Sequence, residues 1–365
     1  MALLLSRCRL RVGLVPAARP DAAAQGPDVR AYALNADSRD LLESLRCWPK
    51  PDSACPVAAM QVFGDANGEV RFDAAEQGAP ALAWIVDAAA LLEQLGQAVG
   101  FAPEIEMLSS AQPATLQVIC EGGASASRSH FGVELASAAY PQRAIAARLS
   151  CDKPHQQVAY QWFAQGEILG ILPMGAADGN SVAIVWSVTH DHAQALLDAS
   201  EDDFVRELRL ASRDQLGAFR LTSERCAWPL KLERAQRWTG QSDGQSWALA
   251  GDAAHMLHPL AGQGLNLGLA DARELARVLG QREYWRAVND ERLLRRYERA
   301  RKADVMAMGL VTDGLQQLFS REGGAWQAGR NWGMRGFERS GPLKHWMARR
   351  AMGAVAVAGR LVGPR

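Results

Sequence analysis

A short segment near residue 250 brings a carboxylate together with closely spaced glycines. The run WALAGD (247–252) is short and apolar, as in a buried strand, and it ends in Gly251 and Asp252. Ligands of open α/β sheets bind beyond the carboxyl ends of strands, where Asp252 would accept hydrogen bonds from ligand hydroxyls. Gly262 and Gly264 follow, and glycine lets a backbone approach a ligand closely. An isolated Gly-Asp pair is also compatible with a simple helix cap.

A helix is predicted directly after these glycines, over about residues 263–279. Its apolar positions recur at helical spacing, namely Leu265, Leu269, Ala272, Leu275, Ala276 and Leu279. The first turn of a helix carries free N–H groups and a partial positive charge. We therefore expect this helix start to stabilise an anionic or electron-rich ligand edge beside Asp252.

Two histidines share the segment, and Asp252, His255 and His258 are spaced three apart. Ligand types at this spacing raise the question of a metal site, but no further ligand is evident. Pro259 also bends the chain beside His258. The sequence therefore predicts no metal site, and the histidines are expected to form a wall or a capping pair.

The elements that must position this segment alternate between helix and strand at both ends of the chain, whereas strands dominate the middle. The strand candidates of the middle are residues 143–150, 158–163, 168–172 and 181–188. This order predicts an α/β domain that is interrupted by a mainly antiparallel sheet and followed by a helical C-terminal region.

The whole stretch GDAAHMLHPLAGQGLNLGLADARELARVL (251–279) resembles the second FAD-binding signature of the class A FAD-dependent aromatic monooxygenases. Weaker similarities to the ubiquinone-biosynthesis hydroxylase branch run in family order from about residue 10 to past 310. Two of them are YQWFAQGEILGILPM (160–174) and LLRRYERARKADVMAM (293–308). The resemblance implies a Rossmann-like FAD-binding domain interleaved with an antiparallel substrate-binding sheet.

Domain boundaries follow from the same resemblance. The FAD-binding domain is expected to comprise residues 1–55, 87–135 and 240–310. The substrate-binding sheet domain is expected to comprise residues 56–86 and 136–239, and residues 311–365 form the helical C-terminal region.

The resemblance also assigns cofactor-binding residues. The carboxylate that matches Asp252, next to Gly251, binds the ribityl chain of FAD in that family. Pro259 and the Gly262-Gln263-Gly264 turn pass the isoalloxazine ring, and the helix start at Leu265 and Asn266 faces its pyrimidine end. Arg30 matches an arginine close to the flavin and its phosphates, with a solvated surface arginine as the alternative.

The sequence departs from the family at several positions. It contains no G-x-G-x-x-G, and Met1 falls inside the helix that should follow that loop. Pro16 stands where an acid should hold the adenosine ribose, and Asp87-Ala88-Ala89 replaces an arginine. A third signature is reduced to EGGASASRS (121–129), in which Arg128 is expected to keep the basic role.

Two explanations of the absent loop stay open. Either the start of the protein is assigned too far downstream, or the chain is a degenerate paralogue that binds FAD weakly or not at all. A fold without its first strand would leave neighbouring sheet edges unpaired, which is costly, so we favour the first explanation.

The activity implied by the resemblance is hydroxylation of an aromatic ring by FAD, with NAD(P)H and O2 as co-substrates. A polyprenylated phenol of ubiquinone biosynthesis is the expected substrate, and other proteins of that pathway are possible partners. The alternatives are a non-catalytic accessory scaffold and a flavin monooxygenase of a soluble aromatic. No catalytic residue is identified, and four aromatic residues are expected either to pack in the core or to line the pocket: Trp84, Trp162, Phe163 and Trp186.

Bulk composition excludes some classes of function. The 365 residues carry 40 basic and 40 acidic side chains, which argues against a general nucleic-acid binder. Six cysteines without a C-x-x-C pair indicate free thiols in a reducing cytosol. No apolar run is long enough to span a bilayer. The segment His345–Arg360 mixes apolar and arginine residues, which fits a packed amphipathic helix or a peripheral contact with the inner membrane.

Overall fold

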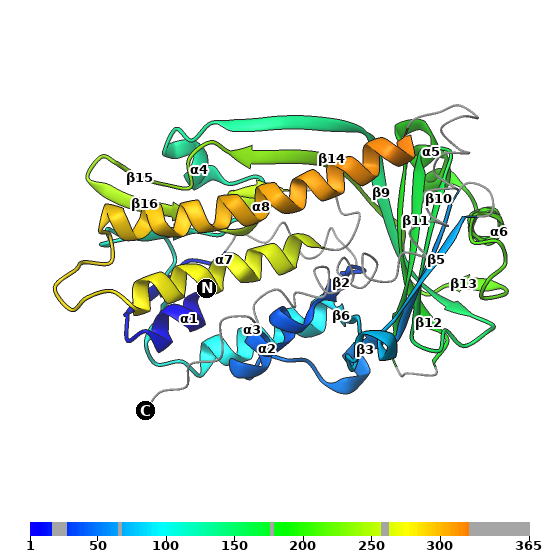
Figure 1. The fold of residues 1–365 in the computed structure, drawn as a ribbon, viewed down its shortest axis with the longest axis horizontal. Helices are drawn as coiled ribbons and strands as arrows, with labels where there is room; N and C mark the ends of the chain where they lie inside the picture. Colours follow the sequence, from blue (N-terminus) through cyan, green and yellow to red (C-terminus); the bar gives the residue numbers. More distant parts are fainter. Residues whose placement is uncertain (17–27, 65–67, 176–178, 257–262, 321–365) are drawn as a thin grey trace.

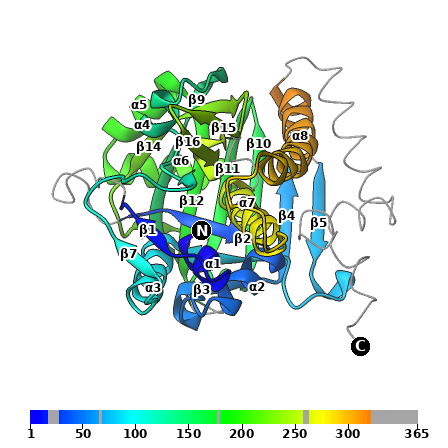
Figure 2. The same ribbon diagram turned by 90° about the vertical axis from the view of Figure 1, so that its left-hand side faces the viewer.

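The computed structural model describes residues 1–16, 28–64, 68–175, 179–256 and 263–320. A large sheet stands at one end of the molecule, and two long helices, α7 (Gln263–Gly280) and α8 (Glu291–Ser320), extend away from it (Figure 1). Viewed from the opposite end, α7 and the N-terminal helix α1 (Ala2–Arg7) lie in front of that sheet (Figure 2). The mixed α/β fold expected from the sequence is confirmed.

The large sheet contains nine strands within the described residues, in the order β17-β14-β9-β12-β11-β10-β4-β5, with β13 paired to β9. All its pairs are antiparallel except β10 with β4. The strands are β4 (Ala59–Phe63), β5 (Glu69–Asp73), β9 (Leu135–Cys151), β10 (Val158–Ala164), β11 (Glu167–Met174), β12 (Ser181–Thr189), β13 (Phe219–Leu221), β14 (Cys226–Ala235) and β17 (His255–Met256). The antiparallel middle layer predicted from the sequence is therefore present.

One face of this sheet is covered by α5 (His190–Asp198) and α6 (Glu201–Ala211). Trp162 and Trp186 are buried there and pack in one apolar cluster with Leu196 and Phe204 of the helices. Burial of such large apolar side chains is the main force that holds the helices against the sheet. The opposite face of the sheet is left for the functional site.

His192 of α5 bridges two carboxylates above this sheet. Its Nδ1 lies 2.6 Å from Glu167 Oε1 of β11, and its Nε2 lies 2.6 Å from Glu207 Oε1 of α6. Burial alone lowers the pKa of His192, but the hydrogen bonds and charges of Glu167 and Glu207 outweigh it and raise the pKa above its ordinary value. The bridge therefore stabilises the fold at acidic pH, below about 6.5, and is lost as pH rises through the raised pKa.

We predict that His192→Gln lowers the melting temperature at pH 6 and has a smaller effect at pH 9. The free energy involved is about 1 kcal/mol or less, because Glu207 is half exposed. Thermal unfolding of both proteins across this pH range measures the difference. A difference that stays constant with pH would contradict the assignment.

The parallel strands of the expected dinucleotide domain form two separate small sheets, called the two pieces here. The strand β1 (Val12–Leu14) pairs with β7 (Ile105–Met107), and β8 (Gln117–Ile119) pairs with β16 (Gln245–Leu249), which also pairs with β15 (Thr239–Ser242). Within the described residues, β1 and β8 thus have one sheet neighbour each. Side chains of both pieces pack with α1, α7 and α8 in one apolar core. The two pieces are therefore held together by packing rather than by a shared ladder of hydrogen bonds.

A fourth sheet contacts both the large sheet and α7. Its antiparallel order is β2-β6-β3, from β2 (Ala31–Leu34), β6 (Ala83–Asp87) and β3 (Ala54–Val57). The helices α2 (Ala36–Ser44) and α3 (Ala88–Gly100) begin directly after β2 and β6 and are capped by Asn35 and Asp87. The remaining short helices are η1 (Pro51–Ser53), η2 (Ala75–Gln77), α4 (Ala126–His130) and η3 (Gly251–Ala253).

This fourth sheet takes strands from both of the domains expected from the sequence, so the domain boundaries stay a proposal. In the expected C-terminal region, α8 continues to Ser320, and the segment His345–Arg360 lies outside the described residues. Among the described helices, none combines the length and the apolar character needed to cross a bilayer.

Candidate functional site

A cavity of about 870 Å³ lies between the fourth sheet, the free face of the large sheet and the start of α7. Five of the residues that the sequence singled out lie in its wall, namely Arg30, Gly251, Asp252, Gly264 and Leu265. This volume lies in the range of sites for small molecules and cofactors, which are mostly apolar with a few placed polar groups. Segments that are far apart in the sequence therefore meet around one site.

Asp252 lies in η3, directly after the strand β16 that the sequence predicted. Its side chain is exposed to the cavity, and within the described residues its carboxylate makes no hydrogen bond or ion pair. The cavity walls still remove water, and this burial raises the pKa of Asp252, an effect that His255 and Arg30 partly offset. A partly desolvated carboxylate without a protein partner is a strong acceptor for ligand hydroxyls.

Gly251 permits the sharp turn that presents this carboxylate. Its φ is 62°, in the left-handed region that favours glycine. A Cβ atom on Gly268 of α7 would lie 3.4 Å from the Gly251 Cα, so the turn and the helix touch through two residues without side chains. The close contact sets the position of Asp252 relative to the start of α7.

A buried ionic network supports the turn at Gly251 and Asp252. Asp271 Oδ2 of α7 accepts a hydrogen bond of 2.9 Å from the Gly251 N–H and lies 2.7 Å from His255 Nε2. Its other oxygen accepts a bond of 2.7 Å from Arg301 Nε of α8. All three side chains are almost fully buried. His255 is thus part of the support of the turn, and no group of metal ligands occurs within the described residues.

The start of α7 offers an open surface to the cavity. An added Cβ on Gly264 would meet nothing within 4 Å, and Leu265 lines the wall beside it. Gln263 begins the helix, although the structure does not describe its side chain. Pro259, Gly262 and His258 lie outside the described residues, so their predicted places in the site stay predictions.

The Asn266 side chain does not line the cavity, although the resemblance placed this residue beside the flavin ring. Its side chain is buried outside the cavity wall, and its Nδ2 donates to Ala33 O at 2.8 Å. Its Oδ1 accepts from Asn35 N at 3.0 Å and from Ser38 Oγ at 2.7 Å. The side chain therefore ties α7 to β2 and α2, and a contact with a ligand is left to its backbone.

Arg30 lies across the cavity wall in an ion pair with Asp28. Its Nε and Nη2 donate to the two oxygens of Asp28 at 2.8 and 2.7 Å, and these bonds raise the pKa of Arg30. The side chain is about half exposed and its guanidinium lies 5.9 Å from the centre of the Tyr32 ring. Arg30 therefore lies at the wall of the cavity as a cation paired with Asp28, and its contact with a cofactor stays a prediction.

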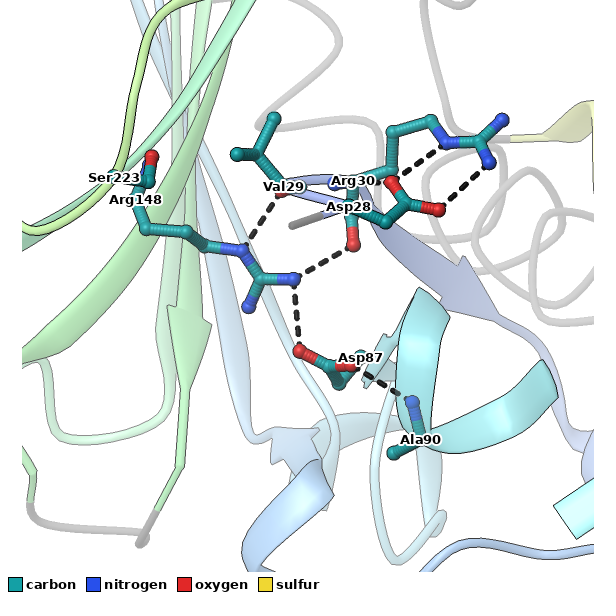
Figure 3. Close-up of polar contacts among 7 residues, drawn as sticks. All are labelled: Asp28, Val29, Arg30, Asp87, Ala90, Arg148 and Ser223. Atoms are coloured by element: carbon teal, nitrogen blue, oxygen red, sulfur yellow. Dashed lines mark hydrogen bonds and ion pairs between the residues drawn. The ribbon is translucent and has the colours of Figure 1, made fainter. Parts of the chain in front are cut away.

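The segment that carries Arg30 is held by Arg148 of β9 (Figure 3). Arg148 donates to Val29 O at 2.8 Å, to Arg30 O at 2.7 Å and to Asp87 Oδ2 at 2.9 Å. Asp87 in turn caps α3 by accepting a bond of 2.9 Å from Ala90 N. The Asp87 that replaced a family arginine thus has an ion-pair partner, and one guanidinium joins three segments of the chain.

Arg128, expected to keep a basic role, is buried and donates to main-chain oxygens. Its Nη1 lies 3.1 Å from Ala253 O and its Nη2 lies 2.5 Å from Gly123 O. It therefore supports the turn next to Asp252 and presents no free charge to the cavity. The basic role expected from the sequence stays a prediction, and the side chain lies outside the cavity wall.

The four aromatic residues proposed for either core or pocket lie in the core. Trp84, Trp162, Phe163 and Trp186 are buried, and none of them is among the residues that line the cavity. The aromatic side chains that do line it are Tyr32, Phe72, Tyr160 and Trp228. The core alternative is therefore confirmed.

The site fits one half of a flavin dinucleotide. The Asp252 carboxylate, which has no hydrogen-bond partner among the described residues, suits a polyhydroxyl chain, and the open helix start at Gly264 suits an electron-rich ring edge. The phosphate-binding loop G-x-G-x-x-G has no counterpart in the sequence. The residues present therefore account for the ring and its ribityl chain.

Comparison with known proteins agrees with this fit. Residues 113–310 match the family model described as an FAD binding domain. The uncharacterized protein slr1300 of Synechocystis is 30% identical over 341 residues, which cover 85% of this chain and 80% of that protein. The ubiquinone hydroxylase UbiL of Rhodospirillum rubrum is 34% identical over 66% of this chain and 55% of its own length. The 3-demethoxyubiquinol 3-hydroxylase of Escherichia coli is 27% identical over 92% and 90%.

Solved structures share the fold at lower identity. The probable FAD-dependent monooxygenase pqsL of Pseudomonas aeruginosa superposes with a TM-score of 0.71 at 21% identity, covering 90% of this chain and 94% of that one. The HpxO protein of Klebsiella pneumoniae, complexed with FAD and uric acid, gives 0.70 at 14% identity, covering 97% and 93%.

Proposed function

The chain belongs to the FAD-dependent aromatic-ring monooxygenases of the ubiquinone-biosynthesis hydroxylase type, and on this basis we propose that it hydroxylates a polyprenylated phenol with NAD(P)H and O2. The observation that carries the proposal is the continuity of the cavity. It runs from the polar wall at Asp252 and Gly264 to the apolar face of the large sheet. A cofactor and an apolar substrate would therefore share one continuous space.

Each part of the wall has a chemical task in this proposal. Asp252 accepts hydrogen bonds from the ribityl hydroxyls, and the start of α7 faces the negative edge of the reduced ring. Arg30, held in place by Arg148 and Asp28, contributes positive charge at the same wall. When bound, FAD would carry electrons from NAD(P)H to O2, and O2 would be the source of the oxygen atom added to the ring.

The apolar walls of the cavity exclude water from that chemistry. Val57, Met60, Leu82, Ile85 and Leu172 line the substrate side. A dry site protects reactive species from side reactions and strengthens each polar contact within it. It also suits a substrate with a long hydrocarbon tail, since transfer of apolar surface from water is favourable.

A turnover assay tests the proposal. Purified full-length chain with added FAD is expected to consume NADH or NADPH faster when an alkylphenol is present, and to form a product with one additional oxygen atom. An alkylbenzene of equal length serves as the control, because it lacks the electron-rich phenol ring. Reduced-nucleotide consumption without any hydroxylated product would argue against a monooxygenase that acts on phenols.

A second candidate function is an accessory, non-catalytic scaffold for other proteins of ubiquinone biosynthesis. The departures from the family at Pro16 and at Asp87-Ala88-Ala89 favour it, because they replace residues that the resemblance assigns to the cofactor. The two candidates differ in bound flavin. Protein that is colourless after purification and does not take up added FAD would favour the scaffold.

A further inference from the structure

The loop between α7 and α8, residues 281–290, carries two exposed aromatic side chains next to each other. Tyr284 is 94% exposed and Trp285 is 66% exposed, and their ring centres lie 4.8 Å apart in an edge-to-face arrangement. The loop stands at the end of the molecule away from the large sheet (Figure 1). Neither residue lines the cavity, so the cofactor site does not explain their exposure.

Contacts within the loop hold this aromatic pair in place. Arg286 forms ion pairs with Glu283 at 2.7 Å and with Asp290 at 2.9 Å. Val288 packs against the apolar core of α7 and α8, and Asp290 also accepts a hydrogen bond of 3.2 Å from Leu293 N at the start of α8. Aromatic rings on a fixed loop lose little further freedom when they bind a partner, which favours binding.

The exposed side of α8 next to this loop is lined with arginines. Their spacing of three and four residues places them on one side of the helix. The opposite side is buried in the core through Leu293, Leu294 and Tyr297. The exposed set is Arg292, Arg295, Arg296 and Arg299. Together with Tyr284 and Trp285, these four arginines are called the α8 face here.

Most of the positive charge on the α8 face is free of carboxylate partners. The two acids of the loop are already paired with Arg286, and Glu291 is paired with Arg295. The arginines without an ion pair among the described residues are Arg292, Arg296 and Arg299. Arg292 also lies in the first turn of α8, where the helix dipole disfavours a cation. The stability of the helix therefore does not account for these arginines.

We propose that the α8 face binds the surface of a bilayer that contains anionic phospholipids. Tyrosine and tryptophan favour the boundary between hydrocarbon and water, because each has an apolar ring and a polar tip. Arginines beside them attract negatively charged headgroups. Such a contact is peripheral and needs no helix that crosses the bilayer. It is also independent of the proposed function, since it involves neither flavin nor substrate.

The composition of the α8 face favours a lipid surface over a protein partner. The centre of a protein–protein interface is apolar and poor in charged side chains. Here two rings stand at one end of a row of four arginines, without a broad apolar centre. A charged bilayer surface meets both parts at once, because headgroups and the apolar boundary beneath them lie within a few ångströms.

Vesicle flotation tests the proposal. The full chain is mixed with vesicles of phosphatidylcholine, or of phosphatidylcholine with phosphatidylglycerol. Wild type is expected to bind the anionic vesicles at least about 10-fold more tightly than the neutral ones, and to release them as salt is raised. Arg292→Gln with Arg296→Gln should weaken this binding by about 5-fold for each arginine. Tyr284→Ala with Trp285→Ala should weaken it by about 10-fold or more.

Matched controls come from other surfaces of the molecule. Phe101→Ala removes a ring that is 88% exposed after α3, and Arg206→Gln with Arg220→Gln removes two exposed arginines of α6 and β13, near the large sheet (Figure 1). Both controls should bind vesicles as wild type does. Every variant keeps residues 345–360, so that segment cannot cause a difference between them.

Brominated lipids locate the contact, because they quench the emission of tryptophans that reach the bilayer. Trp285→Phe should bind within about 2-fold of wild type, since a ring is kept, but lose the quenching. Equal binding of wild type to both kinds of vesicle, or unchanged binding of the folded double variants of the α8 face, would overturn the proposal. So would a wild-type dimer that binds no vesicles and becomes a monomer in Tyr284→Ala with Trp285→Ala, which would assign the face to a contact between copies.

Discussion

Replacement of Asp252 by alanine is expected to remove FAD from the protein, with a loss of affinity of at least about 100-fold. A carboxylate that accepts two hydrogen bonds from ligand hydroxyls contributes about 1.5 kcal/mol or more for each bond, and the two together correspond to about two factors of ten. No described residue competes for the Asp252 carboxylate, so its full capacity is available to a ligand. Flavin absorbance of the purified protein and a titration with FAD measure the effect.

Asp40→Ala is the control for this variant. Asp40 is an exposed aspartate on α2, in the same layer of the molecule, and its replacement should leave FAD binding unchanged. Asp252→Asn adds a second comparison, because the amide keeps the size and one acceptor oxygen and removes the charge. Equal flavin content in Asp252→Ala and wild type would sink the assignment of this carboxylate to the cofactor.

Asp271→Asn is expected to destabilise the protein by about 3 kcal/mol, as is typical when one partner of a buried ion pair is removed. Asp271 joins the Gly251 N–H, His255 and Arg301, and its side chain is fully buried. Without its charge, the ion pair that Arg301 keeps among the described residues is with Asp304, whose side chain is largely exposed. The Asp252 turn would also lose its anchor, so a weaker affinity for FAD should accompany the loss of stability.

Denaturant unfolding of wild type and variant gives the change in the free energy of unfolding. Glu291→Ala is a suitable control, since the pair of Glu291 and Arg295 is exposed and such pairs contribute about 1 kcal/mol or less. A variant Asp271→Asn as stable as Glu291→Ala would show that the buried network contributes little.

Local patterns in the sequence were sufficient to predict the strand and the helix on either side of Asp252. The apolar run before Asp252 forms β16 and the turn after it, and the apolar spacing from Leu265 to Leu279 forms α7. These patterns succeed because each element buries one face, which leaves a periodic trace in the chain. The antiparallel middle was predicted for the same reason.

The contacts between distant segments could not be read in this way. Arg148 is more than a hundred residues from Val29 and Arg30, and no periodicity links a strand arginine to two carbonyl groups of a loop. Asn266 was assigned to the cofactor by its position at the helix start, yet its side chain holds β2 and α2. Both outcomes depend on which elements meet in three dimensions.

One residue of the site that was not predicted, Asp271, could have been recognised from its position in the sequence. Asp271 lies four residues after Leu267 and four before Leu275, on the buried face of α7. Residues at this spacing share one side of a helix, so a charge among leucines indicates a buried partner. The identity of that partner, Arg301, still required the structure.

The contact between Gly251 and Gly268 has a consequence for the kind of molecule that fits. Because no side chain separates the turn from the helix, the span from the Asp252 carboxylate to the first turn of α7 is a fixed length. A methyl group on Gly268 would already touch the Gly251 Cα at 3.4 Å, so a larger side chain there would move the acid away from the helix and lengthen that span. A ligand bound at both points must therefore have a matching distance between its hydroxyl groups and its ring edge. The contact between these two glycines thus restricts the length of cofactor that can bind.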